Sequence, residues 1–556
     1  MDGYTLEDQI AYAWSSARRT RAVHSLEHIH LARYVRPELA EFFEERKTTD
    51  RPAIELIWDD TPIKANDMWA RGVWSMAHNP TSQWFFYKHK ATANVDDEST
   101  AWIGRVNSDL QQEAKSSGLY PALLERLKDT GAFGFGALYS YENKEDRRKI
   151  TFEYVPAPEC FYTLNREGRC NFFIRPLNIT AKEAIEERKW PKEKLDRSIV
   201  EAYERKDITT KFLFLHVVWE RAGPLPARPL TNKQYPIAGY FYQVSNRSVV
   251  DEHGFKRFPY HVLGWGGAVN TPYPAGIGYK TLAEIRNLNA TRRDYSEIIG
   301  LEADSPVLAP QQGEQPGSAQ FKPVAGEMIW GGMSGEGKRL YEPYYNGTNS
   351  RQLLPDIQDS RNEIREAWNY SLFMMHTQKE MTAQEVRSRD AKIVQAMGPY
   401  MIYFQSDAQS VIERMFLARL EAGVYDPIPR QIAESPSLEL EFSGLLAKAQ
   451  QQIEGEQIVG FYSEASLIAG FDADVVRFGI DHAAALRHLA ESKTMPTGIV
   501  LSKEAYEEAV ARNAQQQQMM QAAAMAPDLA RAARDGAAAM KDMNANESPS
   551  NQVAAG

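Results

Sequence analysis

Two histidines and a glutamate near the N-terminus have the spacing of a zinc site. His24, Glu27 and His28 form the pattern His-x-x-Glu-His, which puts two imidazoles one helical turn apart with a carboxylate as general base. Such a site would make the protein a zinc peptidase. A catalytic zinc needs a third protein ligand, which the sequence does not mark, and His30 lies about 200° round the helix from His28. The alternative, which we favour, is a solvated helix face without metal.

A glycine-rich stretch at 131–136, Gly-Ala-Phe-Gly-Phe-Gly, could cradle a phosphate. That function requires a strand, then the loop, then a helix. Here the helical pattern precedes the glycines, a strand follows at 137–141, and no Gly-Lys-Ser/Thr occurs in the sequence. We therefore predict a helix-to-strand corner and no nucleotide cofactor. Cys160 and Cys170 are too few for a metal cluster and receive no role.

Composition limits the class of protein. A chain of 556 residues with 43% apolar residues can form two to four domains. The net charge of −10 argues against a general nucleic-acid binder. No apolar run has the length of a membrane span, and the N-terminus has no signal pattern. We expect a soluble protein made in a cytosol.

The longest predicted element is a helix at 382–423. Thr382 and Glu385 form a capping box at its start, apolar residues recur three or four apart along it, and Gly423 ends it. About 40 residues at 1.5 Å each give a rod of about 60 Å, longer than a compact domain needs. Pro399 follows Gly398 inside it, so we expect the rod to bend there without breaking.

The rest of the chain predicts an α+β fold that is mainly helical. Helical patterns cover the first forty residues, 65–76, 101–115, 121–130 and 180–188, and strand patterns cover 151–155, 160–164, 171–175, 212–219 and 237–244. Helices at 277–300 and 357–374 enclose an insertion rich in Gly, Pro and Tyr. An insertion at the tip of such a hairpin is well placed to meet a partner. Beyond the Pro-rich segment 425–436 we expect helices at 445–461, 463–469, 473–479, 481–491 and 502–520.

Several short motifs follow one another along the chain in a specific order. They are Asn-Pro-Thr-Ser-Gln-Trp-Phe at 79–85, the glycine corner, His-Gly-Phe at 253–255 with Phe-Pro-Tyr at 258–260, Gly-Ile-Gly at 276–278 with Leu-Asn at 288–289, Asp-Ser-Pro-Val-Leu at 304–308, and Met-Thr-Ala-Gln-Glu-Val at 381–386. In this order and spacing they resemble the head-to-tail connecting (portal) protein family of short-tailed bacteriophages, over about residues 58–429. Two departures affect local contacts. The family's Tyr-Gly-Arg-Gly is here Tyr-Pro-Ala-Gly at 273–276, and its Asp-Pro-Pro is Asp-Ser-Pro at 304–306.

The resemblance implies wing, stem, clip and crown regions around the long bent helix. It divides the chain into an N-terminal α+β wing (1–270), a first stem helix (271–304), a clip (305–351), a second stem helix (352–375), a channel loop (376–381), the long wing helix (382–423), a helical crown (424–525) and a disordered tail (526–556). The rod would then bury its faces against neighbouring copies in a ring.

The resemblance also implies a function. Twelve copies would form a ring with a central channel at one capsid vertex of the virion. A separate terminase ATPase docked on the clip would pump double-stranded DNA inward, and the DNA would later leave by the same route. Tail adaptor or nozzle proteins would then bind the clip, and the major capsid and scaffolding proteins would surround the ring. The chain itself would be no enzyme, would need no cofactor and would bind no membrane.

Two sets of residues carry this implied function. In the channel loop the DNA-facing side chains would be His376, Thr377, Gln378, Lys379 and Glu380. In the clip the partner-binding side chains would be Met328, Trp330, Tyr341, Tyr344 and Tyr345. Lys379 would make salt-dependent phosphate contacts; the alternative is an ordinary solvated cation. A different neck protein, such as an adaptor ring, is the rival within phages, but adaptors are much shorter and lack the helix–insertion–helix stem.

Overall fold

The computed structural model describes residues 5–43, 53–89, 97–143, 146, 148–221, 231–265, 272–303, 307–308, 336, 338, 342–343, 350–374, 383–434, 438–443, 457–465, 482, 484–486, 489, 511–512, 515–516 and 519. The chain divides into two units, 1–447 and 448–556, and each is described by itself. In the second unit, residues 457–465 form one helix. It overlaps two of the predicted helices, and most of the other residues predicted to be helical there lie outside the described part.

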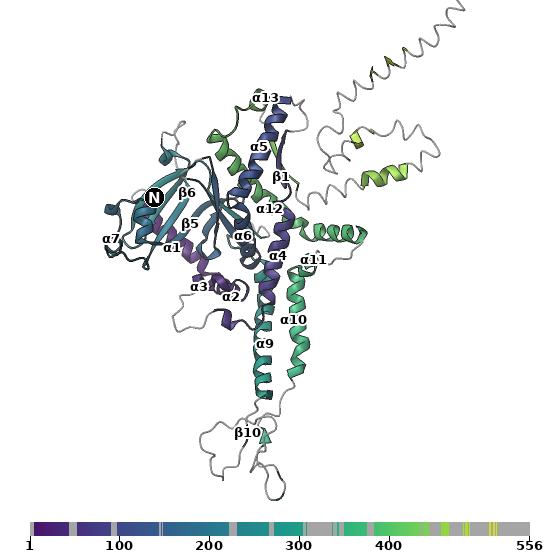
Figure 1. The fold of residues 1–556 in the computed structure, drawn as a ribbon. Helices are drawn as coiled ribbons and strands as arrows, with labels where there is room; N and C mark the ends of the chain where they lie inside the picture. Colours follow the sequence, from purple (N-terminus) through teal and green to yellow (C-terminus); the bar gives the residue numbers. More distant parts are fainter. Residues whose placement is uncertain are drawn as a thin grey trace, which may run out of the picture. The chain divides into compact units, whose positions relative to one another are not determined.

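Helices dominate the N-terminal part of the first unit (Figure 1). They are α1 (Leu6–Ala22), α2 (Ser25–Val35), α3 (Ala40–Phe43), α4 (Thr61–Ala77), α5 (Asp97–Ser116) and α6 (Leu119–Phe133), with 3₁₀ turns η1 (Pro37–Leu39) and η2 (Ala53–Leu56). A capping box starts α1: the Asp8 N–H donates to the Thr5 hydroxyl, and the Thr5 N–H donates to the Asp8 carboxylate. The helical predictions for this region are confirmed.

A five-stranded antiparallel sheet follows, with strand order β4-β5-β6-β7-β8. Its strands are β4 (Phe161–Leu164), β5 (Cys170–Thr180), β6 (Lys211–Glu220), β7 (Ile237–Gln243) and β8 (Ser248–Phe255). Residues alternate between its faces. On β6, Leu215 and Val217 share a buried cluster with Ile10 of α1, whereas Phe214 shares one with Ile199 of α7 (Arg197–Glu204). Apolar residues on both faces of the sheet are thereby covered.

A second sheet carries the glycine corner. Its order is β3-β2-β9, from β2 (Phe135–Glu142), β3 (Ile150–Val155) and β9 (Tyr260–Gly264). Gly134 ends α6 in the left-handed region, with φ of 89°, and β2 begins at the next residue. Because L side chains rarely adopt such a φ, glycine suits this position. The helix-to-strand corner is confirmed.

Other features of the first unit differ from the sequence predictions. Strands β8 and β9 and helix α7 were not predicted, and the helix expected at 180–188 contains a π-helical turn, Glu183–Glu187. The resemblance implies a helical segment at 424–525, whereas the structure has the short helix α13 (Arg430–Glu434) and then a strand, β12 (Leu438–Phe442). Strand β12 pairs antiparallel with β1 (Phe85–His89). The helical assignment is wrong for residues 438–442.

The helical hairpin and the long helix are confirmed. The first arm is α8 (Ile277–Lys280) and α9 (Leu282–Ala303), and the second is α10 (Leu353–Ala367) and α11 (Tyr370–Met374). Helix α12 spans Ala383–Glu421, 39 residues without a break at Gly398 or Pro399; the bend there stays a prediction. Gly423, with φ of 68°, ends the helix, and the Val424 N–H bonds back to the Arg419 carbonyl. No helix within the described ranges is long and apolar enough to cross a membrane.

Candidate functional site

The helical hairpin brings both ends of the 305–351 insertion to one place (Figure 1). Where α9 ends, Glu302 accepts hydrogen bonds of 2.9 Å from the backbone N–H and from the hydroxyl of Ser350, and these bonds lower the pKa of the Glu302 carboxyl. Next to this contact, β10 (Val307–Leu308) pairs antiparallel with β11 (Glu342–Pro343). The chain therefore leaves the hairpin and returns to it at neighbouring points, which the Glu302–Ser350 contact and the β10–β11 pair hold together.

The first arm of the hairpin is fixed by a contact between glycines. A Cβ on Gly134 would lie 2.0 Å from the Pro274 carbonyl oxygen, and one on Gly276 would lie 2.5 Å from the Gly134 nitrogen. A Cβ on Gly278 would likewise meet the Ala132 carbonyl oxygen at 2.5 Å. The glycine corner and the Gly-Ile-Gly helix start are thus two halves of one backbone contact, which sequence reasoning identified separately without connecting them.

The second arm is held by an ion pair and by an edge-to-face contact between two indoles. Arg361 of α10 donates two hydrogen bonds, at 3.0 and 2.7 Å, to the buried Asp59 carboxylate. Burial tends to raise the pKa of Asp59, but bonds from Thr61 and Arg361 outweigh it and lower that pKa. Trp368, fully buried at the end of α10, meets Trp69 edge to face at 6.2 Å. Both arms are therefore anchored in the N-terminal region.

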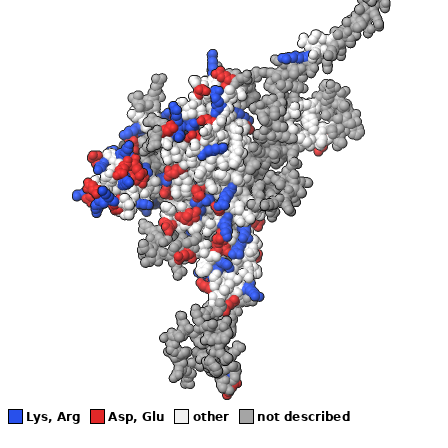
Figure 2. Space-filling model, viewed as in Figure 1, with Lys and Arg blue, Asp and Glu red and all other residues white. Residues whose placement is uncertain are grey.

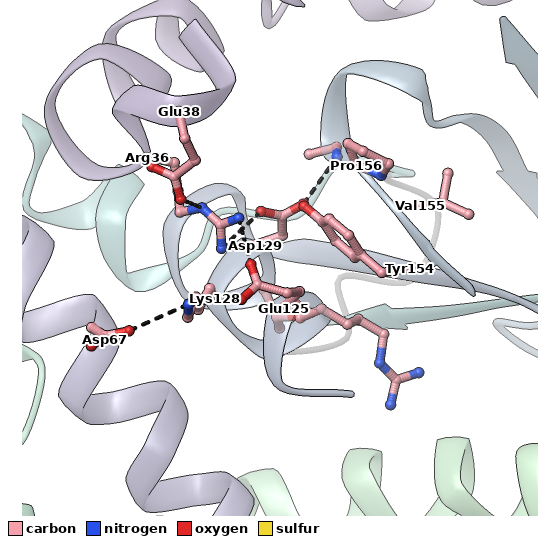
Figure 3. A network of polar contacts seen from close by, with 12 residues as sticks. Arg36, Glu38, Asp67, Glu125, Lys128, Asp129, Tyr154, Val155 and Pro156 are labelled. Carbon is pink, nitrogen blue, oxygen red and sulfur yellow. Dashed lines mark hydrogen bonds and ion pairs between the residues drawn. The ribbon is translucent and has the colours of Figure 1, made fainter. Parts of the chain in front are cut away.

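A buried polar network joins the N-terminal helices to α6 and β3 (Figure 3). Asp129 of α6 is fully buried; it accepts bonds from the Tyr154 hydroxyl at 2.5 Å and the Ala157 N–H at 2.9 Å, and it lies 3.4 Å from Arg36. Arg36 also contacts Glu125 at 3.1 Å. Burial raises the pKa of Asp129 to about 6, against the opposing effect of Arg36. Removing Arg36 or Asp129 alone would leave the other side chain buried without its partner, which is costly.

Buried ion pairs also fix the C-terminal half of α12. Asp407 lies 2.6 Å from Arg126 of α6, with both side chains buried. Near the helix end, Arg419 reaches Asp109 and Glu113 of α5 at 2.6 and 2.7 Å. Because these contacts span two helices, this half of the rod is tied to the N-terminal region at several points along its length.

A serine–histidine–serine chain connects the second sheet to α12. The His261 ring lies 3.1 Å from the Ser140 hydroxyl and 3.0 Å from the Ser410 hydroxyl. Burial lowers the pKa of His261 to about 3, so the imidazole is neutral near pH 7. Ser140 is fully buried, so this chain has the geometry of a packing contact rather than of an accessible nucleophile.

The structure does not favour zinc chemistry at the His-x-x-Glu-His pattern. His28 is only 4% exposed, and its ring packs within 6 Å of the rings of Phe133, Phe135 and Tyr273. Burial, helped by Arg21 and His24, lowers its pKa to about 3. Among the described residues no cluster of three or more His, Cys, Asp or Glu could hold a metal. The solvated-face prediction is wrong for His28, which lies among aromatic rings.

Comparisons with known proteins decide the family. A model of the family described as "Bacteriophage head to tail connecting protein" matches residues 7–500. The chain belongs to this family. It is similar to a protein named "Probable portal protein" of Bordetella phage BPP-1, at 22% identity over 482 residues and 85% of each chain. It is also similar to the "Portal protein" of Salmonella phage epsilon15, at 22% identity over 531 residues and 91% of each chain.

Family membership covers the hairpin, its insertion and α12, all within the matched residues. The side chains assigned to the channel loop and the clip lie outside the described residues, namely His376, Thr377, Gln378, Lys379, Glu380, Met328, Trp330, Tyr341, Tyr344 and Tyr345. The structure does describe the elements that flank these two segments. The loop joins α11 to α12, and the clip residues lie in the insertion whose ends meet at β10 and β11.

Proposed function

We propose that twelve copies of this chain form a ring at one vertex of a phage capsid, with a central channel for double-stranded DNA. Membership of the head-to-tail connecting protein family and similarity to two phage proteins named as portals support it. The structural observation that carries it is the closed helical hairpin followed by a 39-residue helix. A rod of that length gains most when neighbouring copies cover its free faces, as in a closed ring.

The region names used for the family follow from this proposal. Residues 1–270 and α12 form the wing, the two hairpin arms the stem, and the segment 424–525 a crown that includes β12. The insertion at 305–351 is the clip. It extends from the tip of the hairpin, so its aromatic side chains, Trp330, Tyr341, Tyr344 and Tyr345, are suited to bury area against a partner. The partners are the terminase large subunit during packaging and tail adaptor or nozzle proteins afterwards.

The loop at 376–381 faces the channel in this proposal. It connects the hairpin to α12, so a shift in either element moves the loop. Lys379 contacts DNA phosphates through screened, salt-dependent attraction, and neighbouring polar residues let the duplex slide. The chain catalyses no reaction, because the terminase supplies the energy for DNA movement. Capsid and scaffolding proteins hold the ring at its vertex.

The proposal is tested in virions. A phage carrying this chain with a C-terminal epitope tag is purified, gold-labelled and imaged, and the chain is counted against the major capsid protein by quantitative mass spectrometry. We expect label at a single vertex per particle and twelve copies. Label at many vertices, or on the tail alone, contradicts the proposal. Lys379→Glu is the variant for the channel loop: it should leave the copy number unchanged and lower the packaged DNA.

A further inference from the structure

A pocket lined by arginines lies beside the exposed side of α9. Its volume is about 620 Å³, and its lining includes Arg33 of α2 and Arg286 and Arg293 of α9. Among its lining residues no carboxylate occurs. Trp58, 43% exposed, and Leu56, 38% exposed, add apolar surface. A surface with this composition suits carboxylates presented by another protein chain.

The arginines of α9 form one stripe. Arg286, Ala290 and Arg293 follow the spacing i, i+4, i+7 and are exposed, whereas Ile285 and Leu288 are buried on another side. No ion pair joins Arg286 to any residue in the described ranges. Arg293 pairs with Asp294, its neighbour, at 3.0 Å and with Glu297, one turn on, at 3.7 Å. All three side chains are at least half exposed, and ion pairs of this kind are weak. The stripe can therefore take new anionic partners.

The other arm of the hairpin carries the opposite charge. Four exposed carboxylates of α10 recur at i, i+3, i+7 and i+10 and so share one side of the helix: Asp356, Asp359, Glu363 and Glu366. The buried Ile357 and Ile364 mark its packed side. Across the described residues no ion pair links these carboxylates to the α9 stripe. Figure 2 shows charges of both signs over the surface formed by α9 and α10.

The two stripes lie at closely similar distances along the hairpin from the point where its two arms meet. Glu302 and Ser350 are in contact, and the helices run in opposite directions from that point. Along the first arm, Arg293 lies nine residues and Arg286 sixteen residues from Glu302 (302 − 293 and 302 − 286). Along the second arm, Asp359 lies nine residues and Glu366 sixteen residues from Ser350 (359 − 350 and 366 − 350). The first three residues of the second arm, Ser350–Gln352, form a 3₁₀ turn with a rise of about 2.0 Å per residue against about 1.5 Å in the α-helices. The basic and acidic side chains are therefore level in pairs to within about 1.5 Å.

We propose that the acidic stripe of α10 in one copy binds the arginine-lined side of α9 in the next copy. The inference rests on the proposed ring. In a ring each contact is head to tail, so one copy offers its acidic stripe and its neighbour the basic one. If the ring axis runs along the hairpin, rotation from one copy to the next leaves the position of each residue along that axis unchanged. Arg293 therefore meets Asp359 of a second copy, and Arg286 meets Glu366.

Charge reversal tests this pairing in the full-length chain. The basic-side variant is Arg286→Glu with Arg293→Glu, and the acidic-side variant is Asp359→Arg with Glu366→Arg. The control, Arg197→Glu with Arg205→Glu, makes the same charge change as the basic-side variant at exposed sites in α7 and directly after it. Ring formation is followed by native mass spectrometry and electron microscopy, and folding by circular dichroism and thermal unfolding.

We expect each stripe variant to stay folded but to need at least about tenfold more chain for half assembly, because like charges would face each other. The control should assemble like the unmodified chain. A 1:1 mixture of the two variants should form alternating rings, and the chain with all four changes should form rings alone. Raising NaCl from about 50 to 500 mM should weaken the unmodified rings.

Other results would overturn the inference. Stripe variants that assemble like the control would show that the stripes are not paired between copies, while leaving the ring proposal intact. Normal rings that package less DNA would place Arg286 and Arg293 towards DNA instead. An unmodified chain that forms no ring would remove the proposed function and this inference together.

Discussion

The guanidinium of Arg419, near the end of α12, donates two hydrogen bonds to the carboxylate of Asp109 in α5, at 2.7 and 2.6 Å. A third bond from the same group reaches Glu113 at 2.7 Å. Burial opposes the charge on Arg419, but the two carboxylates outweigh it and raise the pKa of that side chain. One side chain therefore ties the long helix to a segment 310 residues away in sequence.

Removing the Arg419 guanidinium, and with it the bonds to Asp109 and Glu113, should destabilise the fold. Arg419→Met leaves Glu113, whose side chain is 7% exposed, without its cation, so we expect a loss of about 3 kcal/mol in the free energy of unfolding. Urea unfolding measures it. Arg105→Met is the matched control: Arg105 pairs with Asp426 on the surface, where both side chains are more than half exposed, and the loss there should stay below about 1 kcal/mol. Equal losses for Arg419→Met and Arg105→Met would show that the buried bonds of Arg419 stabilise the fold no more than a surface ion pair.

A second prediction concerns the glycine contact at the start of the hairpin. Gly134→Ala puts a Cβ against the Pro274 carbonyl oxygen at a φ of +89°, so we expect a loss of about 3 kcal/mol or more. Gly104→Ala is the control. Gly104 lies in α5 with nothing within 4 Å of the added Cβ, and alanine there should stabilise by about 0.5–1 kcal/mol. Thermal unfolding compares the two, and a harmless Gly134→Ala would refute the close backbone contact.

The elements best predicted from sequence are those with local signals. Helix α12 has its apolar period and a glycine at its end, and Gly423 does adopt the left-handed conformation. The hairpin follows from two helical patterns around a segment with none. Its break at Asn369, which has a φ of +53°, was not predicted, since Asn tolerates that conformation without a distinctive pattern around it.

Contacts between distant segments were not predictable in the same way. Strand β12 pairs with β1, with Phe85 opposite Phe442, and strand pairing depends on the partner more than on local propensity. The burial of His28 depends on Tyr273, which is far away in sequence. The level match of Arg293 with Asp359 requires the Glu302–Ser350 contact, which fixes the register of the two arms.

Buried His28 predicts a dependence of stability on pH. Its pKa is about 3 when folded and near 6.5 otherwise, so the unfolded chain takes up the proton first and stability falls as pH drops from about 6.5 towards 3. At pH 4.5 this histidine accounts for about 2–3 kcal/mol of the loss. His28→Gln, measured by urea unfolding at pH 7.5 and 4.5, should lose that much less between the two values than the unmodified chain. Equal losses would contradict the buried, neutral imidazole.

The His-x-x-Glu-His pattern should not behave as a zinc site. His24 and His28 stack with ring centroids 6.0 Å apart, and His28 packs among aromatic rings. After dialysis with zinc and then metal-free buffer, the chain should retain well below one zinc per molecule, and Glu27→Gln should leave both zinc content and thermal stability unchanged. Stoichiometric zinc that is lost on mutation of His24 would reinstate the peptidase hypothesis.

Electron microscopy of the purified full-length chain, together with its native mass, tests the proposed ring most directly. We expect closed rings of twelve copies with an axial hole, in which the hairpins of neighbouring copies lie side by side. Monomers or dimers without a hole, at concentrations where the chain is folded, would contradict it.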